Sequence, residues 1–154
     1  MSGLLNHSPA EIVQSLIIEE LGLGAAPEIP TADNWPVYAS HHPDTPDDSI
    51  CLFDTEGRLQ GRTQVDGEMH IHHGLQIRVR SLDYSGYAKA QQLAHALDTE
   101  VLRLAVVVDS HSYLVHCLTR TTDVLPLGFE QGSRRRLWTV NFLVAISTLP
   151  GTGT

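Results

Sequence analysis

The sequence is poor in lysine and cysteine and has no long apolar run. Lys89 is the single lysine, and Cys51 and Cys117 are the two cysteines, among 154 residues. The cysteines lie far apart inside apolar stretches, which favours buried thiols over a disulfide or a metal-binding knuckle. No stretch approaches the roughly 20 apolar residues that a membrane-spanning helix needs, and the first residues lack the basic and apolar segments of a signal peptide. We therefore expect a protein that is made in the cytosol, stays soluble and has no membrane partner.

Several sequence signatures of enzymes are also absent. There is no G-x-S-x-G elbow for a serine nucleophile, no glycine-rich phosphate loop, and no HExxH or CxxC metal motif. No internal repeat is present. These absences disfavour a nucleophilic hydrolase or a nucleotide-binding enzyme.

Charge is distributed unevenly between the two halves of the chain. The net charge is −8, but residues 1–77 hold 12 acidic and 2 basic side chains, whereas residues 78–154 hold 6 acidic and 8 basic ones. Nearly all the cations are arginines, whose planar guanidinium groups suit paired contacts with carboxylates. A DNA-binding surface normally carries a basic excess, so general DNA binding is disfavoured. The one basic run, Arg134 to Arg136, is most simply a solvated turn between strands.

Two segments predict helices. In "HSPAEIVQSLIIEELGLG", Ser8 is the N-cap, Pro9 stands at the first helical position, Glu11 completes a capping box, and Gly22 or Gly24 ends the helix. In "YSGYAKAQQLAHALDTEVL", apolar residues recur at helical spacing and predict an amphipathic helix that covers a sheet. That apolar stripe comprises Tyr87, Ala90, Ala94, Leu97 and Val101.

The other apolar runs predict strands. They are a short strand at residues 36–40, a buried strand at "SICLFDT", a half-buried strand at residues 70–80, and three or four strands after residue 103. "EGRLQGR" predicts a turn or hairpin, and "DSHS" and "EQGSRRR" separate the later strands. This order predicts one α+β domain over residues 1–154, with a mainly antiparallel sheet flanked by two α-helices. We expect residues 1–7 and 148–154 to be flexible ends.

The stretch "DGEMHIHHGLQIRVRS" at residues 66–81 has three histidines within four positions. Ile71, Leu75, Ile77 and Val79 share the apolar, odd-numbered face of the predicted strand, and the even-numbered face is polar. On that polar face, His70 and His72 lie about 7 Å apart, so both imidazoles can reach one metal ion, with Glu68 at the same parity. A catalytic site needs at least three protein ligands, and no further motif supplies them. We therefore expect no metal site and no cofactor, and solvated or interface histidines instead.

The order of motifs along the chain resembles a known family. The segments "SPAEIVQSLI", "WPVYAS", "PDTPDDSICLFDTEG", "DGEMHIHHGLQIRVRSLDYSGYAKA", "RTTDVLPLGFE" and "RRRLWTVNFLVAI" follow one another. They are similar to the small tail terminator, or tail completion, proteins of long-tailed bacteriophages, which are often labelled minor capsid proteins. The resemblance covers nearly the whole chain. It is most specific at residues 66–88, where an acidic-glycine turn leads into H-x-G-x-Q-[IV]-x-V-R-[SA] and then into a helix beginning near "GY".

The resemblance implies a structural virion protein and not an enzyme. Such proteins pack a sheet against helices and form a hexameric ring at the head-proximal end of the tail tube, where they stop tube growth and join the head connector. The implied partners are further copies of this chain, the tail tube protein and the head-completion or connector protein, while double-stranded DNA passes through without specific binding. A ring joins two different patches of neighbouring copies. The acidic first half and the arginine-bearing second half of the chain would suit such a contact.

Two charged, glycine-bearing segments, "TEGRLQGRTQVDGEM" and "EQGSRRRLW", are predicted to be mobile in a monomer and ordered by assembly, because they contain few apolar anchors. The candidate residues for contacts with subunits or partners are Arg58, Arg62, Asp66, Glu68, Arg134, Arg135 and Arg136. Two other functions stay open. One is a head-side neck or connector ring, and the other is a small metal-dependent hydrolase that uses His70, His72 and Glu68.

Overall fold

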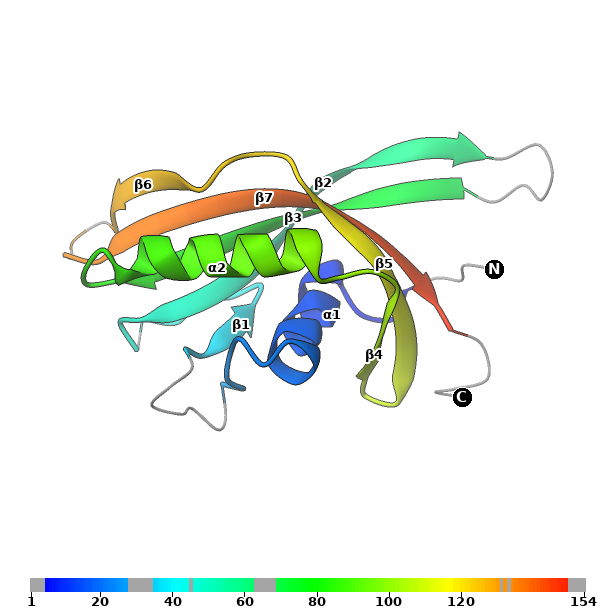
Figure 1. The fold of residues 1–154 in the computed structure, drawn as a ribbon, viewed down its shortest axis with the longest axis horizontal. Coiled ribbons are helices and arrows are strands. Elements are labelled where there is room, and N and C mark those ends of the chain that lie inside the picture. Colours follow the sequence, from blue (N-terminus) through cyan, green and yellow to red (C-terminus); the bar gives the residue numbers. More distant parts are fainter. Residues whose placement is uncertain are drawn as a thin grey trace.

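The computed structural model describes residues 5–27, 35–44, 46–62, 69–130, 132 and 134–149, and within these it describes only the backbone of residues 58–62 and 69–71. One curled sheet packs with two helices (Figure 1). The helices are α1 (Pro9–Ser15), which continues into a π-helical turn, η1 (Leu16–Glu20), and α2 (Ser85–Thr99). The strands are β1 (Val37–Ala39), β2 (Ser49–Arg62), β3 (Met69–Ser81), β4 (Leu104–Val108), β5 (His111–Arg120), β6 (Leu125–Phe129) and β7 (Arg136–Thr148).

The sheet is mainly antiparallel. Its strand order is β1-β2-β3-β7-β5-β4, and among the described strands only β1 and β2 pair in parallel. β6 pairs with β7 beyond the end of β5, so β5 and β6 follow each other along one edge of β7. Between them, Thr121 N donates to Asn141 O at 2.9 Å, which keeps the connection on β7. The predicted α+β fold, with a mainly antiparallel sheet and two helices, is confirmed.

The first helix begins and ends where its sequence predicts. Ser8 Oγ accepts a hydrogen bond from Glu11 N, and the Glu11 side chain accepts one from Ser8 N, so the capping box is formed. Helical residues end at Glu20, two residues before Gly22, whose φ of +64° favours glycine. α1 contacts β1 and β4, which stand at the two ends of the strand order. The sheet therefore curls around α1.

The core lies between the inner face of the sheet and the two helices. Leu75, Ile77 and Val79 of β3 are fully buried, as their shared parity predicts. Ile71, the fourth residue of that predicted face, lies where only the backbone is described. The same face continues on β7 with Trp138, Val140, Phe142, Val144 and Ile146.

α2 lies against β3, β7 and β5. The residues of its predicted stripe that are buried are Ala90, Ala94, Leu97 and Val101. Tyr87, predicted for the same stripe, is 45% exposed, so that assignment was wrong. The first turn of α2 meets the sheet through Gly86, where a Cβ atom would collide with the ring of Trp138. This close approach turns the neighbouring Tyr87 outward.

Residues 56–62, predicted as a turn or hairpin, are strand, so that prediction was wrong. β2 continues through them to Arg62, and two β-bulges interrupt its pairing with β3. Gly57 lies at the first bulge, where a Cβ atom would collide with His72 O. The glycine thus marks a close approach of two strands and not a chain reversal. Residues 63–68, which connect β2 to β3, lie outside the described part of the chain.

The two cysteines differ in exposure. Cys51 is fully buried, as predicted, and burial raises the pKa of its thiol to about 11. Cys117 is exposed, which contradicts the prediction. A β-bulge in β5 shifts the register between Val115 and Cys117. Val115 and Leu118 therefore both face the core, and Cys117 between them points outward.

Candidate functional site

β2 and β3 extend past the rest of the sheet as a two-stranded arm (Figure 1), which we define as residues 56–62 and 69–72. β3 pairs with β7 from His73 onward, and β1 pairs with β2 only as far as Leu52. Among the described residues, the two strands of the arm therefore pair only with each other. An isolated two-stranded hairpin is marginally stable in water. Within the described chain, the arm thus has neither the third strand nor the helix that usually stabilises a hairpin.

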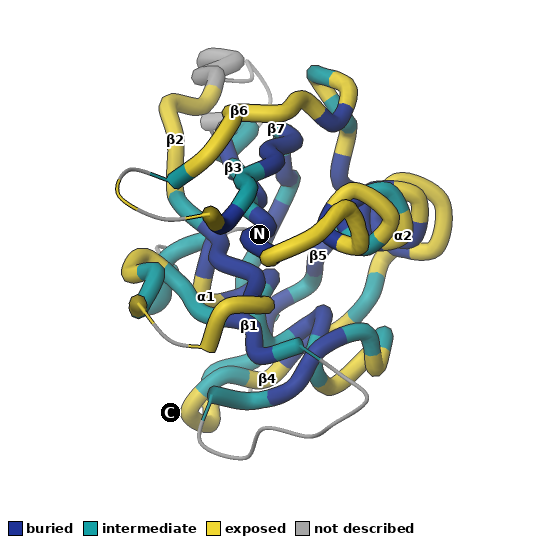
Figure 2. The backbone as a smooth tube through the Cα atoms, turned by 90° about the vertical axis from the view of Figure 1, so that its left-hand side faces the viewer, coloured by how far each residue is buried: buried dark blue, intermediate teal, exposed yellow. Residues whose placement is uncertain are grey.

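Exposed apolar side chains gather at the opposite end of the molecule. Of the eight large apolar residues that are substantially exposed in the described chain, six belong to β6, to the turn before α2 or to the first turn of α2. Together with Arg134 and Arg136 they form what we call the end patch, and they are Leu82, Tyr84, Tyr87, Leu125, Leu127 and Phe129. β6 is exposed along its whole length (Figure 2). A cluster of this kind marks an interaction surface more often than a plain solvent face.

Arg136 occupies the middle of the end patch. Its guanidinium carbon lies 4.3 Å from the ring centre of Tyr84 and 4.7 Å from that of Phe129, so the cation is stacked between two exposed rings. Within the described chain, neither Arg136 nor the exposed Arg134 has an acidic partner. The stacking orients the plane of the Arg136 guanidinium and leaves its N–H edge to bind a carboxylate.

Arg135, predicted as a contact to another subunit, is engaged within its own chain. It is 8% exposed and pairs with Asp44 at 2.6 Å, with Asp47 at 3.5 Å and with Glu130. The hydrogen bond from Arg135 is the main reason why the pKa of the Asp44 carboxyl is lowered. Part of the charge asymmetry between the two halves is therefore neutralised inside one chain.

Arg80 is a buried cation, although the alternation of residues in β3 predicts an exposed side chain at this position. It belongs to the polar face of β3, yet it is 1% exposed. Its guanidinium donates to Pro46 O at 2.7 Å, to Asp47 O at 3.3 Å and to Glu130 Oε2 at 3.3 Å. The loop before β2 folds over this outer face and is fastened there by Arg80.

His42 lies beside these arginines and stays neutral. Burial, and then the positive charges of Arg80, Arg78 and Arg135, lower its pKa from 6.5 to about 3. Its Nε2 atom is 2.7 Å from Ser49 Oγ. His42 therefore helps to hold the loop before β2 against the sheet, and its Nε2 atom is already engaged with Ser49.

A second polar contact, missed by the sequence reasoning, fastens the N-terminal residues. His7 Nδ1 lies 2.6 Å from the Tyr113 hydroxyl, and His7 Nε2 lies 3.4 Å from Asp109 Oδ2. Leu149 N donates to Ser112 O at 3.0 Å. Residues 5–7 and 148–149, the described parts of the expected flexible ends, are thus held near the β4–β5 hairpin. Tyr113 is fully buried in this cluster, whereas the Asp109 carboxylate is exposed.

The remaining candidate residues lie on the arm or beyond it. Arg58, Arg62 and His70 lie in the arm, where only their backbone is described. Asp66 and Glu68 lie outside the described chain. The side chain of His72 is half-buried. Among the residues that the structure describes, no three His, Cys, Asp or Glu side chains are placed to hold one metal ion. The absence of a metal site at "HIHH" stays a prediction.

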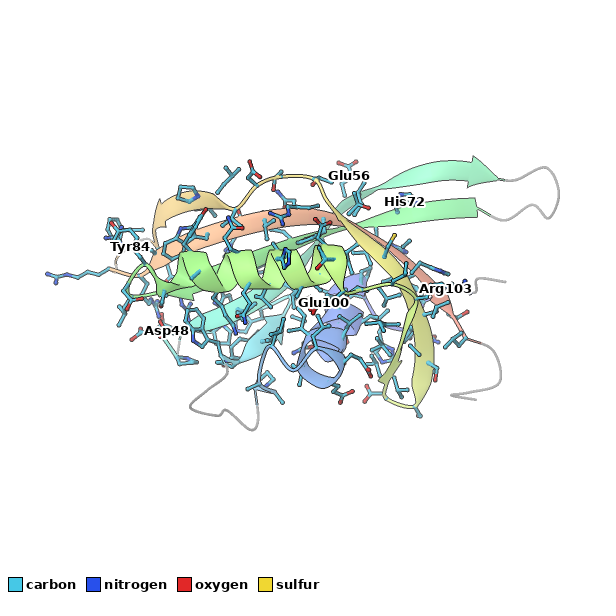
Figure 3. All side chains as sticks on the ribbon, viewed as in Figure 1. Asp48, Glu56, His72, Tyr84, Glu100 and Arg103 are labelled. Carbon is cyan, nitrogen blue, oxygen red and sulfur yellow. The ribbon has the colours of Figure 1, made fainter. Side chains whose placement is uncertain are left out.

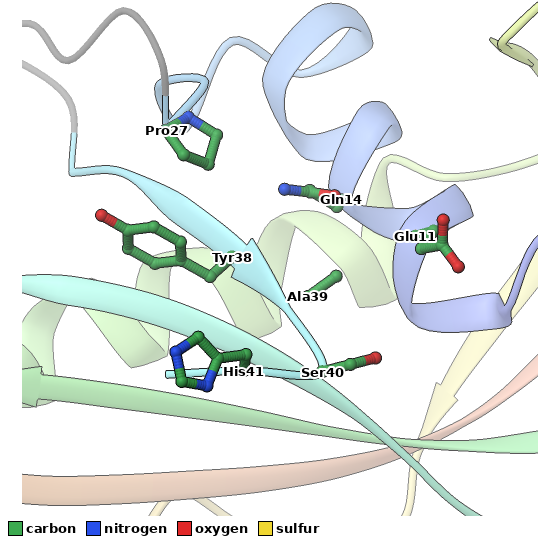
Figure 4. Close-up of a pocket in the computed structure, with 7 residues that line it drawn as sticks. All are labelled: Glu11, Gln14, Pro27, Tyr38, Ala39, Ser40 and His41. Carbon is green, nitrogen blue, oxygen red and sulfur yellow. The ribbon is translucent and has the colours of Figure 1, made fainter. Parts of the chain in front are cut away.

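Open hollows interrupt the described surface, and two of them lie beside α1 and beside the arm. One of about 430 Å³ lies between α1 and β1 and is lined by Glu11, Gln14 and Tyr38, among others (Figure 4). Its polar groups have structural tasks, because Glu11 caps α1 and Gln14 Nε2 donates to Val37 O at 2.7 Å. The other, of about 450 Å³, lies at the base of the arm beside Glu56. Neither hollow supplies an argument for a particular reaction.

None of the helices in the described ranges combines the length and apolar character needed to span a bilayer. Comparison with models of known protein families and with curated protein sequences finds no match.

Proposed function

We propose that this protein is a structural subunit of a bacteriophage virion, a tail terminator that caps the head-proximal end of the tail tube as a six-membered ring. In this role it ends tube polymerisation and forms the joint to the head connector, and it needs no catalysis. The sequence resemblance, which spans nearly the whole chain, supports the assignment to the tail. The two-stranded arm is the observation that carries the assembly function, because among the described residues it lacks the neighbours that a stable sheet requires.

The motif that carries the most specific part of the resemblance has structural tasks in this fold. A Cβ atom on Gly74 would collide with Thr55 and with the backbone of residue 56, so this glycine allows the strands to meet at the base of the arm. Ser81 Oγ accepts a hydrogen bond from Gly86 N at 3.1 Å and joins the end of β3 to the start of α2. Gly74 and Ser81 of this motif therefore have structural roles in the fold, which supports the proposal of a structural subunit.

Two different surfaces are what a ring of identical subunits requires. In a ring, one patch of each copy meets another patch of the next copy, whereas a two-fold dimer uses one self-complementary patch. The arm and the end patch lie toward opposite ends of the long axis (Figure 1). Figure 3 labels Tyr84 near one of these ends and His72 toward the other. This arrangement favours head-to-tail contact.

The negative net charge of the chain fits a ring through which DNA passes. The net charge is −8 per chain, so six copies would carry roughly −48, which disfavours adhesion of passing double-stranded DNA. In the proposed role the subunit contacts its own copies, the tube protein and a head-completion or connector protein. The DNA passes through the ring without specific binding.

A head-side neck ring is the second candidate, because an arm and an opposite patch would serve it equally. The small metal-dependent hydrolase is the third, and it would need His70, His72 and Glu68 to converge on one ion.

Mass photometry and negative-stain imaging test the proposal, with purified protein measured over a range of concentrations and then with phage tail tubes added. We expect particles of six times the monomer mass, with a central hole, and rings seated on tube ends. A protein that stays monomeric at every concentration and never appears at tube ends would refute it. Rings that bind isolated head connectors and ignore tubes would favour the head-side candidate.

A further inference from the structure

Within the described ranges, no third strand pairs with the arm, and no segment covers the exposed apolar side chains of the end patch. β2 and β3 pair only with each other in the arm, as far as the described strands show. The end patch offers five exposed strand residues, 125–129, and β7 is the only described strand that pairs with them. Each surface would be completed by an added element.

Charge complementarity between the two surfaces rests on one described side chain of the arm, Glu56, while the arm also holds Arg58 and Arg62. Glu56, at the base of the arm, is exposed and has no cationic partner among the described residues. Arg134 and Arg136 have no acidic partner there either. Stacked arginine and tyrosine side chains are typical of residues that dominate binding energy at protein interfaces. A carboxylate from a second molecule would fit the free edge of the Arg136 guanidinium.

Side chains would carry more of this recognition than the backbone. Pro126 has no N–H to donate, and Gly128, with φ +84°, lies where the pairing of β6 with β7 shifts register. Both features disfavour backbone hydrogen bonding between β6 and strands of other molecules. The apolar and aromatic side chains of the patch remain open to a partner of defined shape.

Resting on the proposed function, we infer that the occupant of the end patch is the arm of a second copy of this chain, with Glu56 of one copy beside Arg136 and Arg134 of the next. The two surfaces lie at opposite ends of the long axis, so one copy cannot satisfy both itself. The contact is therefore heterologous, and repeating it generates a ring or a filament.

A charge exchange tests this contact directly. Glu56→Arg places two positive groups together, and Arg136→Glu places two negative groups together, so each variant alone should need at least about tenfold higher concentration to assemble. The variant with both changes, and an equal mixture of the two single variants, should assemble at the wild-type concentration. Mass photometry measures the assembly state of all four samples: the two single variants, the double variant and the mixture. Leu102→Glu, an exposed position outside the arm and the end patch, serves as the control and should assemble normally.

Cysteine cross-linking gives a second, independent measurement. In a Cys117→Ser background, Glu56→Cys chains mixed with Leu127→Cys chains should form dimers with a short bis-maleimide, and neither chain should do so alone. Dimers of Leu127→Cys with itself would mean a symmetric patch-to-patch contact and would overturn the inference. Cross-links from Leu127→Cys to tube protein, with none to Glu56→Cys, would overturn it in favour of that occupant.

The two proposals fail in different ways. If the wild type forms rings but the exchanged pair does not recover assembly and no mixed cross-link forms, the arm-to-patch contact is wrong and the terminator function stands. If the wild type forms no ring in solution or on tubes, both are wrong.

Discussion

Replacing Arg80 with methionine should destabilise this fold far more than the same replacement at Arg120. Arg80 is 1% exposed, and its guanidinium binds two backbone carbonyls of the loop before β2 as well as Glu130. Methionine retains the apolar stem but removes all three bonds. Arg120 is a matched control, since it lies on a neighbouring part of the sheet and pairs with Asp98 at 3.9 Å with both side chains partly exposed.

The expected difference follows from burial and bond length. Hydrogen bonds that involve a charged group contribute a net stability of about 1.5–3 kcal/mol each. The bond from Arg80 to Pro46 O is 2.7 Å long, but the other two, at 3.3 Å, are at the weak end of the range. Removing one partner of a buried ion pair costs about 3–5 kcal/mol. We expect Arg80→Met to lower the free energy of unfolding by about 3 kcal/mol, and Arg120→Met by less than about 1 kcal/mol.

The pH dependence separates a charge effect from a packing defect. The pKa of His42 is lowered to about 3 in the folded chain, against an ordinary value of 6.5, first by burial and then by Arg80, Arg78 and Arg135. Between these values the unfolded chain binds more protons than the folded one, so the wild type loses stability as the pH falls from 6.5 toward 3. Without Arg80 the pKa of His42 rises and this loss shrinks. The stability gap between the wild type and Arg80→Met should therefore narrow as the pH is lowered from 7 to 4.5.

Urea unfolding, followed by the fluorescence of Trp35 and the buried Trp138, measures these quantities at each pH. Equal losses in Arg80→Met and Arg120→Met at neutral pH would show that the guanidinium bonds of Arg80 do not hold the loop. If the difference in the free energy of unfolding between the wild type and Arg80→Met does not change with pH, the destabilisation comes from packing alone. That result would contradict the expected contribution of His42.

Three further outcomes are expected. Gly74→Ala should cost about 1–3 kcal/mol in urea unfolding, because its Cβ atom would collide with β2, and a cost under about 0.5 kcal/mol would mean that the strands separate easily there. Thiol titration of the native protein should count one fast cysteine, Cys117, since Cys51 is buried and its pKa is raised to about 11; two fast thiols would contradict the register shift in β5. The double variant His70→Asn with His72→Asn should keep ring formation and lose less than about 1 kcal/mol of stability. Elemental analysis of untagged protein should find no stoichiometric zinc, whereas one zinc per chain, lost together with tail completion in the double variant, would favour the hydrolase.

Much of the fold could be predicted because it depends on neighbours in sequence. Ser8 and Glu11 are three residues apart, so the capping box follows from local geometry alone. The alternation of Leu75, Ile77 and Val79 likewise assigns the buried face of β3 without knowledge of its partner strands. The glycine-rich "EGRLQGR" was misread because a glycine at a bulge and a glycine in a turn look alike in one sequence.

The candidate site was only partly predictable. Arg134 and Arg136 were named from the basic run, and both belong to the end patch. Arg135 between them turns inward to acidic residues that precede it by up to 91 positions, a pairing that no local pattern reveals. The apolar part of the patch was not foreseen, because exposed and buried apolar residues share the same composition and differ only in what covers them.

By itself, then, the sequence determined the α+β class, the limits of α1 and the inner face of β3, all of which rest on periodicity and capping within a few residues. Tertiary structure decided the burial of Arg80, the exposure of Cys117 and the isolation of the arm. Each of these depends on which distant segment lies alongside: the loop over Arg80, the register shift of β5 against β7, and the end of β3–β7 pairing at His73. Such contacts join residues far apart in the chain, and strand register and bulges decide which of them meet, so no local pattern of the sequence specifies them.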